Sequence, residues 1–103
     1  MPLNAAKKKA FRTIGHGLKP VVTVADKGLT EGVVKEALRA LNDHELIKVK
    51  FAVGDREVKR QLIVSFCEQT EAELVQTIGH VALIYKPARE RNELLSNLTR
   101  PSS

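Results

Sequence analysis

The sequence contains only one cysteine, Cys67, among its 103 residues. A single thiol excludes an intrachain disulfide framework and a zinc site built from several cysteines. Apolar runs are short as well, and none approaches the roughly 20 residues that a membrane-spanning helix needs. Residues 1–14 begin with basic side chains but carry no apolar core, which argues against a secretory signal. We therefore expect a cytoplasmic protein in a reducing compartment, with no membrane partner.

Aromatic residues make up only 4% of the sequence, and tryptophan is absent. The three phenylalanines stand within apolar patterns and are predicted to lie in the core. This excludes an exposed aromatic platform of the kind on which RRM domains stack bases. Any nucleic acid would then be recognised through its backbone and shape more than through its bases.

Motifs for catalysis and cofactor binding are also missing. No Walker-type loop or dinucleotide-binding fingerprint occurs, and His16, His44 and His80 are too far apart for a metal-ligand spacing. Cys67 follows Phe66 in a helical pattern, which favours an inert buried thiol over a nucleophile. We expect a protein that is not an enzyme and that uses no metal, cofactor or small-molecule substrate.

Acidic residues are absent from the first quarter of the chain, since the first of them is Asp26. Five cations precede it: Lys7, Lys8, Lys9, Arg12 and Lys19. Together with a net charge of +5 and a pI near 9.6, this asymmetry favours a polyanionic partner. The alternative is a solvated helix face that serves solubility alone.

Hydrophobic periodicity predicts seven elements in a chain of single-domain length. Helices are expected at residues 3–16, 29–43 and 56–70, and strands at residues 21–24, 45–52, 74–78 and 81–85. The order α-β-α-β-α-β-β predicts an α/β fold, in which a four-stranded mixed sheet with parallel first strands is packed with helices. Gly79 and His80 form a hairpin turn. We assign the single domain to residues 1–87 and a polar, basic, flexible tail to residues 88–103.

Three burial patterns follow from the same periodicity. The first helix is expected to bury one stripe, made of Ala5, Ala6, Ala10, Phe11 and Ile14. The β-branched run at residues 21–24 is apolar on both faces, which predicts a strand covered on both sides. Residues 45–52 alternate, so that Lys48 and Lys50 fall on an open face of their strand.

A glycine-terminated turn, Ala25-Asp26-Lys27-Gly28, joins the first strand to the second helix. Lys27, the N–H groups near Gly28 to Glu31 and the positive end of the helix dipole could seat a phosphate there, with Thr30 as N-cap. The alternative is an ordinary strand-to-helix turn. His16 lies between two glycines, where it could contact a phosphate or a base, or cap the end of the first helix.

Four segments resemble those of the CRM domain family (chloroplast RNA splicing and ribosome maturation) in its bacterial stand-alone YhbY form. The segments are Gly-His-Gly-Leu-Lys-Pro-Val-Val at residues 15–22, Gly-Leu-Thr-Glu-Gly-Val at 28–33, His-Glu-Leu-Ile-Lys-Val-Lys at 44–50, and Gln-Thr-Ile-Gly at 76–79 with the strand ending Tyr-Lys-Pro at 85–87. Their order and spacing extend the resemblance over about residues 4–91.

The resemblance implies a non-enzymatic RNA-binding module with a fold similar to the C-terminal domain of translation initiation factor three. It further implies binding to ribosomal RNA in precursors of the large ribosomal subunit, since bacterial members associate with these particles. The family's Gly-x-x-Gly loop corresponds to residues 25–28, where Ala25 replaces the first glycine. Alanine would be strained if that position needs a positive φ, or would narrow the approach of a phosphate.

The RNA-binding residues predicted from charge, turn and resemblance are Lys7, Lys8, Lys9, Arg12, His16, Lys19, Lys27, Gly28 and Thr30. A competing hypothesis is a protein-interaction module whose basic face docks an acidic ribosomal protein or assembly factor. No feature of the sequence sets the oligomeric state, and a monomer is favoured.

Overall fold

The computed structural model describes residues 3–91 and 93–98. Its elements keep the predicted order: α1 (Ala5–Gly15), β1 (Pro20–Val24), α2 (Glu31–His44), β2 (Leu46–Phe51), α3 (Arg56–Thr70), β3 (Glu73–Ile78) and β4 (Val81–Tyr85). The predicted cap of α2 is confirmed, because the Thr30 hydroxyl accepts a hydrogen bond of 3.2 Å from the backbone N–H of Val33.

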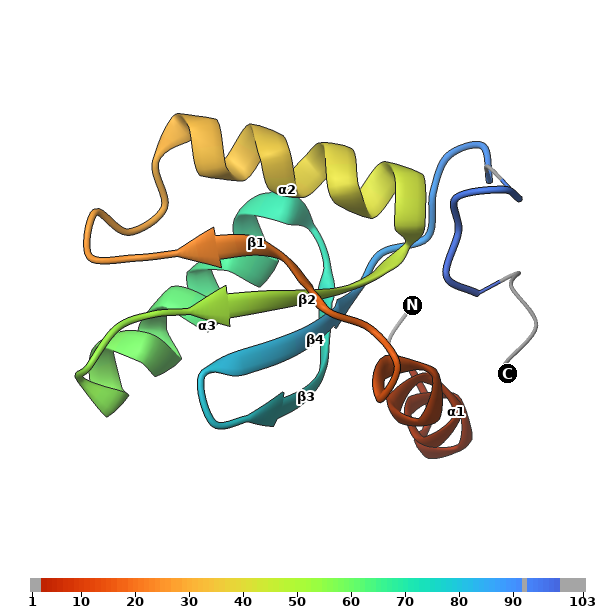
Figure 1. Ribbon diagram of the computed structural model, residues 1–103, viewed down its shortest axis with the longest axis horizontal. Coiled ribbons are helices and arrows are strands. Elements are labelled where there is room, and N and C mark those ends of the chain that lie inside the picture. Colours follow the sequence, from red (N-terminus) through yellow and green to blue (C-terminus); the bar gives the residue numbers. More distant parts are fainter. Residues whose placement is uncertain (1–2, 92, 99–103) are drawn as a thin grey trace.

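The strands form one mixed sheet in the order β1-β2-β4-β3 (Figure 1). β1 runs parallel to β2, whereas β4 is antiparallel to both of its neighbours, β2 and β3. The parallel pair needs a crossover, which α2 supplies, and the antiparallel pair β3–β4 needs only the short turn at Gly79-His80. The predicted α/β fold with a four-stranded mixed sheet is confirmed.

One face of this sheet is sealed by α2 and α3. At its centre the rings of Phe51 and Phe66 are fully buried and meet edge to face, with centroids 5.8 Å apart. The other buried members of this cluster are Val22, Val24, Ala37, Leu41, Ile47, Val49, Ile63, Ala82 and Ile84. This face holds the main hydrophobic core.

Helix α1 covers part of the opposite face. Its half-buried Phe11 lies against Tyr85, with ring centroids 4.8 Å apart. Gly15 brings the helix close to the sheet, because a Cβ at that position would lie 2.7 Å from Cδ2 of Leu83. The predicted stripe is right for Phe11 and Ile14 and wrong for the three alanines at positions 5, 6 and 10, which are exposed. The larger apolar side chains gain more from burial and so set the rotation of the helix.

The prediction that residues 21–24 are covered on both sides is wrong. Val22 and Val24 are buried under α2, but Val21 is 47% exposed and Thr23 is exposed. The reason is the position of β1 at the edge of the sheet, while α1 packs mainly on β3 and β2. A run of β-branched residues therefore does not distinguish a central strand from an edge strand.

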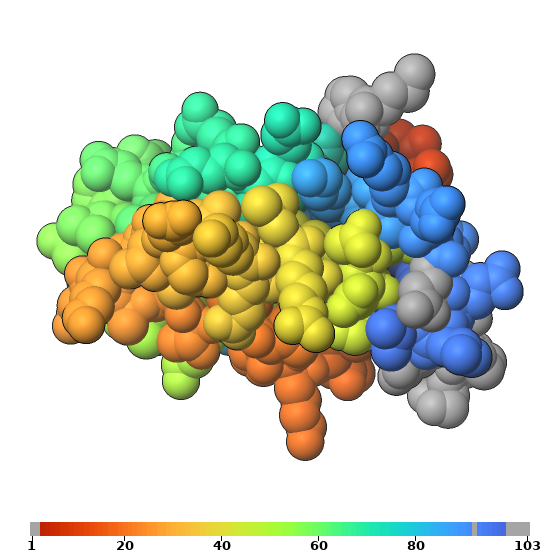
Figure 2. Space-filling view, turned by 90° about the horizontal axis from the view of Figure 1, so that it is seen from above, coloured from red at the N-terminus to blue at the C-terminus, as the bar shows by residue number. Residues whose placement is uncertain are grey.

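Part of the predicted flexible tail makes specific contacts with the domain. The buried carboxylate of Glu45 accepts hydrogen bonds from Ala88 N (3.0 Å), Arg91 Nε (2.6 Å) and Ser96 Oγ (2.8 Å). Farther along, Asn97 Nδ2 donates to the Leu46 carbonyl at 2.6 Å. Figures 1 and 2 show this segment beside the end of α2. Residues 99–103 of the predicted flexible tail lie outside the described residues, and the boundary at residue 87 stays a prediction.

Candidate nucleic-acid interface

The cations of α1 are held on a well-capped helix. The Asn4 side chain accepts a hydrogen bond of 2.8 Å from Lys7 N and begins the helix. Lys7 and Lys9 are exposed, while Lys8 and Arg12 are half-buried. Ion pairs among the described residues join Glu31 to Lys35, Glu57 to Arg60, and Glu45 to Arg91. No cation of α1 takes part in them, so the charge of α1 is not neutralised by contact.

Lys7 differs from its neighbours in its surroundings. It lines a hollow of about 720 Å³ together with Glu71 and Glu73, which come from the turn before β3 and from β3 itself. The sequence suggests no carboxylate near the basic segment, but the fold brings these two into the same hollow. We therefore expect Lys7 to attract a polyanion less strongly than Lys8, Lys9 or Arg12.

His16 is the C-cap residue of α1, and its backbone N–H donates to the Arg12 carbonyl at 3.2 Å. Its side chain is exposed and makes no hydrogen bond with a described residue. Lys19 is also exposed and stands directly before β1. The backbone of His16 thus caps the helix, which leaves the imidazole available for a ligand.

The turn at residues 25–28 is a tight one, closed by a hydrogen bond of 2.8 Å from Gly28 N to the Ala25 carbonyl. Gly28 has a φ of +73°, a backbone conformation that favours glycine. Ala25 does not have a positive φ. Alanine in place of the family's first glycine therefore causes no backbone strain. The other predicted consequence remains, namely that the methyl group of Ala25 narrows the approach of a phosphate.

The N–H groups of this turn are fewer than predicted. Gly28 N is already bound, Thr30 N donates to the Gly28 carbonyl at 3.1 Å, and Val33 N is taken by the Thr30 hydroxyl. Within the described residues, the N–H groups of Leu29, Glu31 and Gly32 form no such bond, and for the last two this is usual in a first helical turn. An anion would therefore meet the start of α2 at the N–H groups of Leu29, Glu31 and Gly32, with Lys27 exposed nearby in sequence.

The basic helix and the turn lie apart. They stand at opposite ends of β1, a strand of five residues that spans about 16 Å (Figure 1). The structure thus groups Lys7, Lys8, Lys9, Arg12, His16 and Lys19 at one end of the sheet, and Lys27, Gly28 and Thr30 at the other. A single phosphate cannot contact both groups of residues, but an extended nucleic-acid strand that crosses the sheet could.

Between these two ends lies a surface that we name the open face. It is the part of the sheet beyond α1, made of Pro20, Thr23, Lys48, Lys50, Gln76, Ile78 and Val81. Leu83 borders it and is itself buried beneath α1. Lys50 is exposed and Lys48 half-buried, as the alternation of residues 45–52 predicts. By contrast, Leu46 on the same side of β2 is fully buried beneath α1.

The cations at the start of α3 are partly engaged. Arg60 pairs with Glu57 at 2.9 Å, and Lys59 Nζ donates to the Gly79 carbonyl at 2.8 Å. The hydrogen bond of Lys59 holds α3 against the β3–β4 turn, whereas the ion pair of Arg60 lies within α3. Because of these two contacts, fewer cations are available to a ligand at the start of α3 than the sequence alone suggests.

Features of catalytic or membrane proteins are not found among the described residues. No cluster of three potential metal ligands occurs in them, and none of their helices is long and apolar enough to cross a membrane. Burial, assisted by the charge of Glu73, raises the pKa of the Cys67 thiol to about 11. Such a thiol is almost fully protonated at neutral pH and is a poor nucleophile.

Residues 3–86 match the CRS1 / YhbY (CRM) domain. The chain belongs to this family. The matched range contains every predicted interface residue, from Lys7 to Thr30. It ends before Arg91 and Ser96, so these two partners of Glu45 stand outside the CRM domain as the family defines it.

Proteins similar to this CRM-family chain come from several bacteria. A probable RNA-binding protein of Pseudomonas aeruginosa is 52% identical over 100 residues, which are 97% of this chain and 96% of that protein. An RNA-binding protein of Haemophilus influenzae is 47% identical over 88 residues, covering 85% and 89% of the two chains. The solution structure of a hypothetical protein from Staphylococcus aureus has a TM-score of 0.76 at 30% identity, covering 89% and 96%.

Proposed function

We propose that this protein is a non-enzymatic RNA-binding protein of the cytoplasm. The observation that carries the proposal is a set of cations on α1 and directly before β1, which have no ion-pair partner among the described residues: Lys8, Lys9, Arg12 and Lys19. Their charge is available to phosphates, and the release of counterions favours that contact. The names of the relatives from Pseudomonas aeruginosa and Haemophilus influenzae support the same function.

The RNA is ribosomal RNA in precursors of the large ribosomal subunit, and the protein assists their assembly as a monomer. Support for this finer part comes from the resemblance to the stand-alone YhbY form, whose members associate with such precursors. The separation of α1 from the turn at residues 25–28 also suits a large structured RNA. A ligand that contacts both predicted sites must be long enough to reach both ends of β1.

The proposal is tested by crosslinking the protein to RNA in growing cells and mapping the crosslinked nucleotides. Crosslinks should concentrate in the large-subunit RNA, and the protein should co-sediment with precursor particles at low salt. Crosslinks spread evenly over unrelated transcripts would overturn the ribosomal part. Absence of RNA crosslinks altogether would overturn RNA binding itself.

The competing function, docking of an acidic ribosomal protein or assembly factor, is separated from RNA binding by ribonuclease. A pull-down of the tagged protein is repeated with and without RNA digestion. Loss of the associated particles after digestion is expected. Their persistence would favour a protein partner for the same basic surface.

A further inference from the structure

The open face presents two rows of side chains across all four strands. Strand pairing places Pro20, Lys48, Leu83 and Gln76 in one row. It places Thr23, Lys50, Val81 and Ile78 in the next row, farther from α1. In each row the lysine of β2 thus lies between a residue of β1 on one side and the residues of β4 and β3 on the other. These side chains of β4 and β3 are mostly apolar.

The charge of this face has one sign. Neither row contains an aspartate or a glutamate, and neither Lys48 nor Lys50 forms an ion pair with a described residue. Because the two lysines are two positions apart on a strand, their Cα atoms lie roughly 6.7 Å from one another. This is a suitable separation for contacts to successive phosphates of an extended strand.

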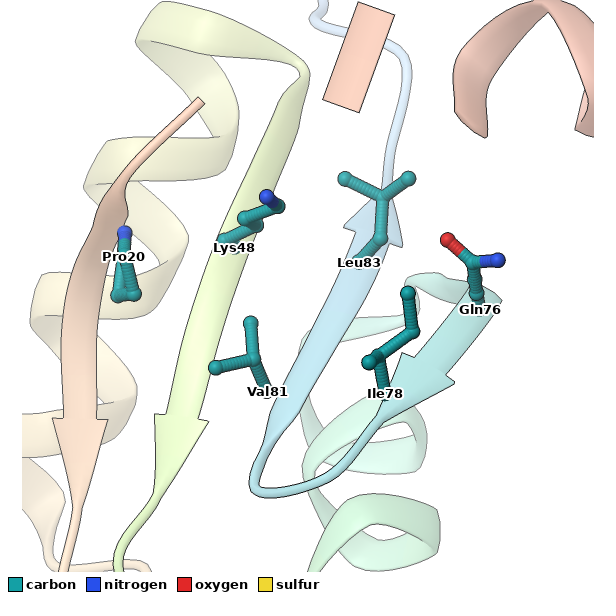
Figure 3. A pocket seen from close by; sticks show the side chains of 6 residues that line it. All are labelled: Pro20, Lys48, Gln76, Ile78, Val81 and Leu83. Carbon is teal, nitrogen blue, oxygen red and sulfur yellow. The ribbon is translucent and has the colours of Figure 1, made fainter. Parts of the chain in front are cut away.

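The apolar part of the face is hollowed into a shallow pocket of about 220 Å³. Side chains from every strand surround it, namely Pro20, Lys48, Gln76, Ile78, Val81 and Leu83 (Figure 3). Ile78 is 63% exposed although it is a large aliphatic residue. The pocket is smaller than the roughly 300–1,000 Å³ of a cofactor site, so that it suits a single flat ring better than a whole cofactor. Gln76 adds an amide at its rim that can hydrogen-bond a polar ring edge.

We propose that the open face binds an unpaired stretch of the RNA, with phosphates at Lys48 and Lys50 and a base against Ile78 and Val81. This inference rests on the proposed function and names a part of the ligand, single-stranded RNA, that the basic helix alone does not specify. Aliphatic contacts replace the aromatic stacking that the sequence excludes. Lys19, which directly precedes Pro20, connects this face with α1, so one strand could pass from the helix onto the sheet.

The test compares two RNA probes of equal length, an unstructured single strand and a perfect duplex, by fluorescence anisotropy at several salt concentrations. The variant Lys48→Gln/Lys50→Gln removes both charges of the open face. Its matched control is Arg39→Gln/Arg56→Gln, which removes two exposed charges without an ion-pair partner among the described residues from α2 and α3, on the opposite side of the sheet. Ile78→Ser removes the apolar contact. Because Ile78 is exposed, this substitution should change the free energy of unfolding only slightly.

Lys48→Gln/Lys50→Gln should weaken single-strand binding roughly 25-fold at 0.1 M salt, because each lost contact lowers the slope of log K against log salt by about 0.7. The control should leave affinity unchanged, and Lys48→Arg/Lys50→Arg should retain it. Ile78→Ser should weaken binding of the single strand and leave binding of the duplex unchanged.

Equal effects of the open-face variant and its control would overturn the inference while leaving RNA binding in place. Equal losses on single strand and duplex with Ile78→Ser would overturn the base contact. Failure of the wild-type protein to bind either probe would overturn the proposed function as well. If Ile78→Ser instead abolished self-association in sedimentation experiments, the face would bind a second copy of the chain, and the inference would be wrong.

Discussion

The two faces of the sheet differ in what covers them, although alternate residues of the same strands form both. On β2, Ile47, Val49 and Phe51 point into the core beneath α2 and α3, whereas Lys48 and Lys50 stand on the open face. Two helices cover the first face, but α1 covers only one end of the second. Stability and ligand contact are thus separated residue by residue along a single strand.

Substitution in the covered face should have the largest effect on stability. Phe66→Ala removes a fully buried ring and should lower the free energy of unfolding by about 3–5 kcal/mol, since it leaves a cavity beside Phe51. Urea denaturation measures this. Val64→Ala on the same helix is the control, because Val64 is 54% exposed and should change stability by less than about 0.5 kcal/mol. Similar losses for both would show that α3 does not seal the core as described.

The next largest effect is expected at Gly15, where the second face meets α1. Gly15→Ala places a methyl group 2.7 Å from Leu83 Cδ2 and should destabilise the protein by about 1–2 kcal/mol. Gly32→Ala is the matched control in α2. Nothing lies within 4 Å of the new methyl there, so a gain of about 0.5 kcal/mol is expected. Thermal or urea unfolding of both variants checks the sign, and a gain at both positions would contradict close packing of α1.

The contacts of Glu45 should give a smaller, pH-dependent effect. Burial acts to raise the pKa of this carboxyl, but hydrogen bonds from Ala88 and Ser96 and the nearby Arg91 hold it below the ordinary value of 4.5. A depressed pKa means that the stabilisation is present above pH 4.5 and is lost as the pH falls through the folded-state pKa. Arg91→Ala should therefore cost about 1 kcal/mol at pH 7 and less at low pH.

Urea unfolding of Arg91→Ala at pH 7 and pH 3 measures this dependence. Arg89→Ala is the control, since Arg89 is exposed and has no partner among the described residues. An equal loss for Arg91→Ala at both pH values would mean that the arginine acts through packing and not through the carboxylate.

The smallest effect on stability, and a clear one on binding, is expected for the cations of α1. Lys8→Gln/Lys9→Gln should change stability by less than about 0.5 kcal/mol but lower the salt slope of RNA binding by about one unit per lost phosphate contact. Lys7→Gln should lower it less, because Glu71 and Glu73 share the hollow of Lys7. Salt titrations of RNA binding, with Arg39→Gln/Arg56→Gln as control, test the ranking. An equal reduction by all three lysines would contradict it.

Periodicity and turn chemistry predict most of the fold from the sequence. Thr30 as N-cap, the parallel first strands and the alternation around Lys48 depend on local patterns, which act over a few residues. Predictions that depend on distant partners were less successful. The exposure of Val21 follows from the edge position of β1, and the acidic neighbours of Lys7 come from residues more than 60 positions away.

The cluster around Glu45 could not be predicted at all. Its partner Arg91 lies 46 positions along the chain and Ser96 lies 51 positions along it. Nothing in the local sequence marks Glu45 as a buried carboxylate, and its φ of +63° is unusual for a residue other than glycine. Polar side chains near the end of a chain are usually expected to be exposed to solvent. Here the fold instead brings them into contact with Glu45, directly before β2.

The strand order β1-β2-β4-β3 leaves two outer strands with unpaired backbone groups along one side. Both carry an irregularity, between Pro20 and Val22 in β1 and between Leu74 and Gln76 in β3. Such bulges twist an edge out of the flat geometry that another sheet would need in order to add a strand, and proline removes one donor outright. A protein that leaves an apolar, cationic sheet face uncovered is thereby protected at its borders against aggregation into extended sheets.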